Sequence, residues 1–397
     1  MFEKIILKSS DSGQPISLGE LAEALLFYQN VHIILEYSSL TQIVSVIGMQ
    51  KLLSILSRQN VSAVYCEDSL GTHTQKSGMI EAHSFISFMI SGDQTVGQLH
   101  KRKDRLEFIL TRQGYSKKQA KVLIEQFRKK VPIRKLTDNY FVEGGIINAA
   151  WQDLSDPIFI HEATKRTLAR QVGANFPLTD YKFEVETYHP NFYIKTNIDF
   201  SEINKKLKHI NSQIDEITPA YLIQNILVGK ADMILAANYG GEFYTSELSS
   251  EIIQLRHNNL LKRINLDKNE LNIFKEITIA ESPSIKEVIN CGERSFDEFL
   301  SLLDKSSKFR EWIHGVNPDV KIATAYLNEI SAQSWVNKGP TKTLRYILST
   351  TIGALEPISG AVFSAADTFI LEKFLGGWHP SHFINQKLKP FLSTEAK

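Results

Sequence analysis

Cysteine is scarce in this sequence. The chain has 397 residues and two cysteines, Cys66 and Cys291. They lie too far apart in the sequence to form the CxxC spacing of a zinc half-site or of a dithiol redox centre. We therefore expect the protein in a reducing, cytoplasmic compartment.

Long apolar runs are missing as well. A membrane-spanning helix needs about 20 mostly apolar residues, and no stretch of the sequence meets this requirement. The nearest approach, residues 350–377, is divided by Glu356, Asp367 and Glu372. We expect no stable transmembrane span but a buried, closely packed helical hairpin at 347–376, whose alternative is an effector hairpin that acts on a membrane or a partner protein. The first residues, MFEKIILKSSDSG, have one short apolar run and no small-residue cleavage site, so they predict a strand and not a signal peptide.

The motifs that would name a reaction are also absent. No GxGxxG follows a strand, and GPTKT at 339–343 lacks the upstream glycine of a phosphate-binding loop. EDSLG at 67–71 places Ser69 after a strand, but Glu67 stands where a nucleophile elbow needs glycine. HEATK at 161–165 lacks the second histidine of a zinc-binding helix. The sequence leaves open whether the protein is an enzyme.

What the sequence does contain, at its start, is an alternation of apolar strand patterns with helical patterns. The strands are expected at 2–7, 31–37 and 61–66, and the helices at 17–28 and 39–58. The second helix is expected to break near Gly48. A further strand is expected at 82–90, after a glycine-containing loop at 71–78. Strands that are apolar on both faces and are connected by helices predict a parallel sheet.

The rest of the chain is predicted to be mainly helical. The expected domains are an α/β domain at 1–95, a basic helical region at 96–175, a β-hairpin with a connecting helix at 176–215, and an all-helical domain at 216–397. A chain of this length usually divides into more than one domain. The expected fold class is α+β overall: an α/β N-terminal domain with a short parallel sheet, followed by a predominantly α-helical C-terminal region with a β-hairpin insertion.

Charge is unevenly distributed although its total is almost balanced, with 45 basic and 44 acidic side chains. Between Lys101 and Lys135 there are thirteen Lys or Arg and three acids, a surplus of ten positive charges. Such a surplus on two predicted helices attracts nucleic acid or another polyanion. The candidate polyanion-binding residues are Lys101, Arg102, Lys103, Arg105, Arg112, Lys117, Lys118, Lys121, Arg128, Lys129 and Lys130.

An internal or subunit contact is the alternative for this stretch. An acidic face on another domain, or on a second subunit of a homo-oligomer or a protein partner, would neutralise its charge. The stretch also has few aromatic residues for base stacking, namely Phe108, Tyr115 and Phe127. The leading hypothesis remains a binding or regulatory protein that engages nucleic acid or another polyanion.

Four acidic residues support an enzymatic alternative, because each follows or ends a predicted strand: Asp11, Glu36, Glu67 and Asp68. The carboxyl ends of strands in an open α/β sheet face the binding crevice. Carboxylates that converge there would suit Mg²⁺ or Mn²⁺, which activates water for attack on a phosphodiester. The second hypothesis is therefore a metal-dependent phosphodiesterase or nuclease.

One further acid lies in an apolar setting. Asp232 belongs to VGKADMILAANYGG, a largely apolar helical pattern in which an ionised carboxylate costs free energy unless a cation meets it. We expect a structural ion pair there, with Lys230 or an arginine as the partner.

Overall fold

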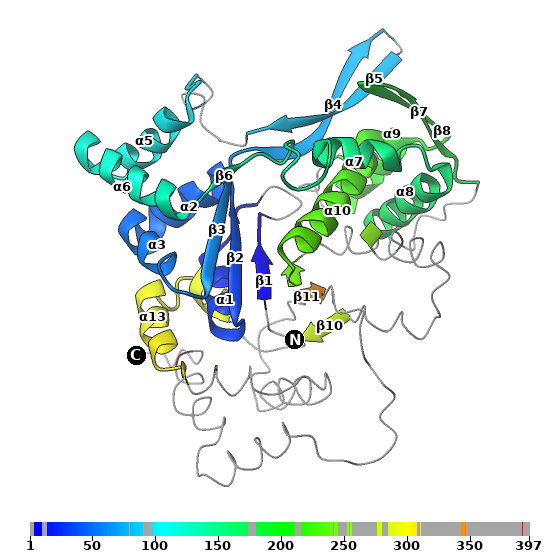
Figure 1. Ribbon diagram of the computed structural model, residues 1–397. Coiled ribbons are helices and arrows are strands. Elements are labelled where there is room, and N and C mark those ends of the chain that lie inside the picture. The colour runs from blue at the N-terminus through cyan, green and yellow to red at the C-terminus, as the bar shows by residue number, and fades with distance from the viewer. Residues whose placement is uncertain are drawn as a thin grey trace, which may run out of the picture.

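The protein is described by a computed structural model, in which two sheets organise the chain (Figure 1). The residues that it describes are 4–9, 14–78, 80–89, 96, 98–173, 180–210, 216–240, 242–244, 252, 253, 255, 276–279, 285–307, 310, 343–346 and 391. Helices and both parallel and antiparallel strands are present, so the class is α+β.

The first sheet has seven strands. In spatial order they are β10 (Glu276–Ile279), β11 (Thr343–Tyr346), β9 (Glu242–Tyr244), β1 (Lys4–Leu7), β2 (Asn30–Leu35), β3 (Val61–Cys66) and β6 (Ile133–Arg134). From β9 to β6 each strand runs parallel to its neighbour, whereas β11 is antiparallel to β9 and β10. The parallel sheet predicted from the first three strands is confirmed.

Both faces of β1, β2 and β3 are buried, which explains why these strands are mainly apolar. Successive side chains of a strand point to opposite faces, so Ile33 and Leu35 enter one core and Ile34 enters the other. The core on the first face is covered by α1 (Leu18–Phe27), α2 (Tyr37–Ile47), α3 (Met49–Ile55), α5 (Arg102–Arg112), α6 (Lys117–Lys130), α12 (Ile285–Asn290) and α13 (Phe296–Asp304).

The second face packs against the helices α7 (Gly145–Asp153), α8 (Pro157–Val172), α9 (Phe200–Ile210) and α10 (Pro219–Tyr239). These helices also contact a second, antiparallel sheet, with the strands β4 (Ser69–Ser77), β5 (Ile80–Phe88), β8 (Asn191–Thr196) and β7 (Phe183–Tyr188) in that order. In Figure 1 this second sheet extends away from the carboxyl ends of the parallel strands, on the opposite side from α5 and α6.

Several helix boundaries follow the sequence signals. Ser17 and Glu20 form the capping box that begins α1, and Thr218 caps α10 with Pro219 at its first position. The helix expected at 39–58 is broken at Gly48, whose φ of 78° separates α2 from α3. The β-hairpin expected within 176–215 is confirmed as β7 and β8.

Three predictions about strands are wrong. Residues 71–77 of the expected loop belong to β4, which pairs with β5, the strand expected at 82–90. A short strand, β6, lies in the region expected to be helical, and the region 216–397 is not all-helical because it supplies β9, β10 and β11. β4 is polar, and β6, β9, β10 and β11 have four residues or fewer, so their apolar patterns are too weak to reveal them as strands.

Candidate functional site

The carboxyl ends of β2 and β3 carry three of the four predicted acids. Glu36 directly follows β2, and Glu67 and Asp68 directly follow β3. Asp11 lies outside the described residues. Parallel pairing of β2 with β3 brings these ends to one edge of the sheet, as the sequence predicts.

Glu67 is held by two arginines from the start of α5. Its carboxylate accepts hydrogen bonds from Nε of Arg102 at 2.9 Å and from Nε and Nη2 of Arg105 at 2.5 and 2.7 Å. Burial favours the neutral acid, but the hydrogen bonds and charges of the two arginines outweigh it and lower the pKa of Glu67. Glu67 therefore serves as an ionised anchor for α5.

Glu36 lies in a different environment, although it is equally buried. Burial raises the pKa of its carboxyl, and hydrogen bonds from Ser9 and Ser69 together with the charge of Lys8 only partly oppose this. The Ser69 hydroxyl is 3.4 Å from Oε2 of Glu36. Asp68 acts electrostatically on Glu36, so the structure brings these two acids near each other.

The predicted metal chemistry finds little support in this arrangement. Both carboxylate oxygens of Glu67 are committed to arginines, and Asp68 accepts a hydrogen bond from the Ser87 hydroxyl at 2.6 Å. Within the described ranges, no group of three or more His, Cys, Asp or Glu side chains is arranged to hold a metal ion. The donor set seen there does not fit Mg²⁺ or Mn²⁺.

Two buried ion pairs connect α10 to its neighbours. Asp232, whose side chain is fully buried, lies 2.8 Å from Nζ of Lys8 at the end of β1. Lys230 instead lies 3.2 Å from Asp153 of α7. The expected structural ion pair of Asp232 is present, but its cation comes from β1 and not from Lys230.

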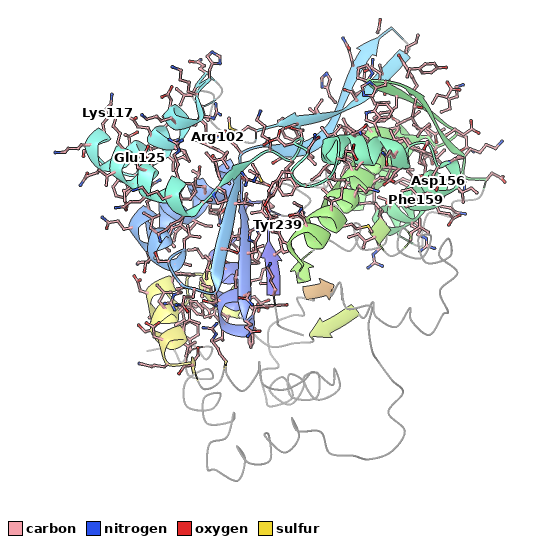
Figure 2. The ribbon with its side chains drawn as sticks, in the orientation of Figure 1. Arg102, Lys117, Glu125, Asp156, Phe159 and Tyr239 are labelled. Carbon is pink, nitrogen blue, oxygen red and sulfur yellow. The ribbon has the colours of Figure 1, made fainter. Side chains whose placement is uncertain are left out.

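The charge surplus of α5 and α6 is largely exposed. α6 begins with a capping box between Ser116 and Gln119, and its apolar stripe of Leu123, Ile124 and Phe127 packs into the first core. The lysines point away from this stripe, and Figure 2 shows Lys117 on the outer side of the helix. We call the exposed lysines of this segment the basic face: Lys101, Lys103, Lys117, Lys118, Lys121, Lys129, Lys130 and Lys135.

The arginines of the stretch behave differently from its lysines. Arg102 and Arg105, two predicted polyanion contacts, bind Glu67 inside the protein instead, so the internal neutralisation considered as the alternative holds for them. Arg112 lies over the ring of Phe108, and Arg128 is 3.4 Å from Glu125 on the same helix. None of the eight lysines of the basic face forms an ion pair with an acid in the part of the chain that the structure describes.

The aromatic residues named in the sequence as stacking candidates do not line the basic face. Phe127 is fully buried, and Phe108 and Tyr115 pack against the first core. Tyr140 is an exposed aromatic residue that the sequence did not reveal as a candidate. The guanidinium of Arg134 lies over its ring. Its only signal is a tyrosine in the turn-forming segment LTDNYFVEGG, shortly after the basic stretch.

The predicted hairpin at 347–376 lies outside the described residues. Among the helices that are described, none has the length and apolar character that crossing a membrane requires. Comparison of the chain with protein-family models, with curated proteins and with solved structures gives no match.

Proposed function

We propose that this protein binds a polyanion, with nucleic acid as the principal candidate, through the basic face of α5 and α6. One observation carries the proposal: eight exposed lysines lie within 35 residues, and no acid in the described ranges pairs with them. Concentrated, solvent-exposed positive charge is the electrostatic footprint of a protein that contacts phosphates.

The positions of the lysines within α6 also favour an external anionic partner. Lys117 and Lys118 lie in the first turn of α6, which has no acidic residue. The helix dipole makes this the unfavourable end for cations, at a cost of a few tenths of a kcal/mol each. Charges placed against the stability of their own helix are better explained by an external anion.

The residue type indicates how the partner is contacted. Lysine presents a flexible point charge, whereas bidentate recognition of a base edge uses arginine. Arg102 and Arg105 are bound to the buried Glu67, and Arg112 and Arg128 contact neighbours on their own helices. Binding should therefore be independent of sequence and driven by release of counterions from phosphates.

A metal-dependent phosphodiesterase or nuclease gains no comparable support. Glu67, one of its proposed ligands, is neutralised by Arg102 and Arg105. We therefore infer a binding or regulatory role and propose no reaction.

Salt dependence tests the proposal. Affinity of the full chain for a fluorescent oligonucleotide should fall linearly on a log–log plot against salt, with a slope no steeper than about −7 for a duplex if all eight lysines contact phosphates. Replacing Lys117, Lys118 and Lys121 by Glu should weaken binding strongly and should make the slope shallower by about one for each lost contact.

A matched control lies on α9, where Lys205, Lys206 and Lys208 are equally exposed. Their replacement by Glu changes the net charge by the same amount, and the ion pairs with Glu202 and Glu216 that it breaks are exposed and worth little. Equal losses in the two triple variants, or no binding by the wild type at low salt, would contradict the proposal.

A further inference from the structure

An exposed aromatic ring follows the basic stretch closely in the sequence. Tyr140 follows Lys135 by five residues and is 48% exposed. The guanidinium of Arg134, the last residue of β6, lies over its ring at 4.2 Å from the centroid. A planar cation and a half-exposed aromatic ring thus lie against each other.

The hydrogen bonds of Arg134 contribute little to the stability of the sheet. Nη1 donates to the carbonyl oxygen of its own neighbour, Ile133, at 3.0 Å. Nε is buried and has no acceptor in the described part of the chain. A buried donor without an acceptor is unfavourable, so sheet stability alone does not explain an arginine here.

The loop that carries Tyr140 is well ordered by its own contacts. Phe141 is buried in the second core, and its ring meets that of Tyr140 edge-on at 5.0 Å. The backbone N–H of Gly144 donates to Oδ1 of Asn139 at 2.9 Å. Gly145, at φ of 80°, lies so close to the carbonyl oxygen of Thr137 that a side chain would not fit. A ring held in this way loses little conformational freedom on binding.

Arg134 lies at the edge of the parallel sheet where α5 begins, and the backbone carbonyl of Tyr140 accepts a hydrogen bond from Asn238 at the end of α10. Arg134 pairs in register with Cys66 at the end of β3. The charges of both Arg134 and Arg102 act on the Cys66 thiol, so Arg134 and the start of α5 lie around the same strand end. Figure 2 places Arg102 at the upper ends of the parallel strands.

We propose that Arg134 and Tyr140 form a stacking site for an unpaired base, so that the polyanion bound by the basic face is a single-stranded nucleic acid. This inference rests on the proposed function. Unpaired bases expose their faces to aromatic rings and guanidinium planes, whereas the bases of a duplex are stacked on each other. Charge from the basic face and one rigid stacking surface are together the two elements of sequence-tolerant single-strand binding.

The test compares two single strands with the same number of phosphates, an oligo-dT and an abasic strand, by fluorescence anisotropy with the full chain at one salt concentration. The wild type should prefer oligo-dT, and Tyr140→Ala should weaken binding to oligo-dT by about fivefold to hundredfold while binding to the abasic strand stays unchanged. Tyr140→Trp should keep the preference. Tyr188→Ala is the matched control, because Tyr188 is an exposed tyrosine on β7, and it should change neither affinity.

The outcomes separate this inference from the proposed function. Equal affinity of the wild type for both strands, lost from both in the α6 triple variant, overturns the stacking site and leaves polyanion binding intact. No binding to either strand overturns both. If Tyr140→Ala unfolds, Arg134→Lys replaces it: this variant keeps the charge but removes the planar group, and it should lower affinity for oligo-dT alone.

Discussion

Glu36 and Glu67 each directly follow a strand of the parallel sheet, and both are buried. Burial raises the pKa of Glu36, because its neighbours Ser9, Lys8 and Ser69 stabilise the charged form only weakly. Burial also disfavours the charged form of Glu67, but Arg105 and Arg102 lower its pKa overall. The two side chains should therefore contribute to stability with opposite dependence on pH.

The prediction is a crossing pair of pH profiles, measured by urea unfolding. A lowered pKa means that Glu67 stabilises the fold above the ordinary pKa of glutamate and that this contribution is lost as pH falls through its folded pKa. Glu67→Gln should thus be destabilised at neutral pH, by about 3 kcal/mol for a broken buried pair, and less so in acid. A raised pKa means that ionised Glu36 costs stability, so Glu36→Gln should gain relative to the wild type as pH rises above the ordinary value. Parallel profiles for the three proteins would contradict these assignments.

At the scale of the element, α6 combines a stable inner face with a first turn whose charges are unfavourable for the helix. Leu123, Ile124 and Phe127 fix it to the sheet, and the ring of Phe127 meets Tyr65 of β3 at 6.0 Å. Lys117 and Lys118 occupy its first turn. Binding and stability should therefore respond in opposite directions to charge reversal at these two positions.

Lys117→Glu and Lys118→Glu should each stabilise the protein, by about 0.3–1 kcal/mol at low ionic strength, because an acid in the first turn interacts favourably with the helix dipole. Thermal unfolding measures this, and the same samples should bind oligonucleotide more weakly than the wild type. Matched reversals at Lys129 and Lys130, in the last turn, should destabilise instead, since cations are favoured there. A loss of stability in the first-turn variants would show that these lysines have a structural role.

The elements also show how far the sequence determines the fold. The capping boxes of α1, α6 and α13 are local signals, formed by residues three positions apart, and the first and third could be read directly. β9, β10 and β11 depend on partners far away in the chain, and their short sequences contain no sign of them, whereas β4 is missed because its sequence is polar. In the site, the positions of Glu36, Glu67 and Asp68 at strand ends were predictable. The ion pairs of Glu67 were not, because Arg102 and Arg105 reach it only after α5 has packed against the sheet.

At the scale of the whole molecule, charge is separated although the net charge is only +1. The segment from Lys101 to Lys135 carries a surplus of ten positive charges, so the rest of the chain carries about nine negative ones. In Figure 1, α5 and α6 form one end of the molecule, on the opposite side of the parallel sheet from α10. A polyanion should therefore approach from one side, and the acidic remainder should keep it from binding elsewhere.

The measurement that tests this account most directly is lysine footprinting of the full chain by acetylation and mass spectrometry, with and without a saturating single-stranded oligonucleotide at low salt. The account predicts that Lys117, Lys118, Lys121, Lys129 and Lys130 lose reactivity when the oligonucleotide is bound, while Lys205, Lys206 and Lys208 on α9 keep it. Protection of the α9 lysines instead, or unchanged reactivity of the basic face under saturating conditions, would contradict it.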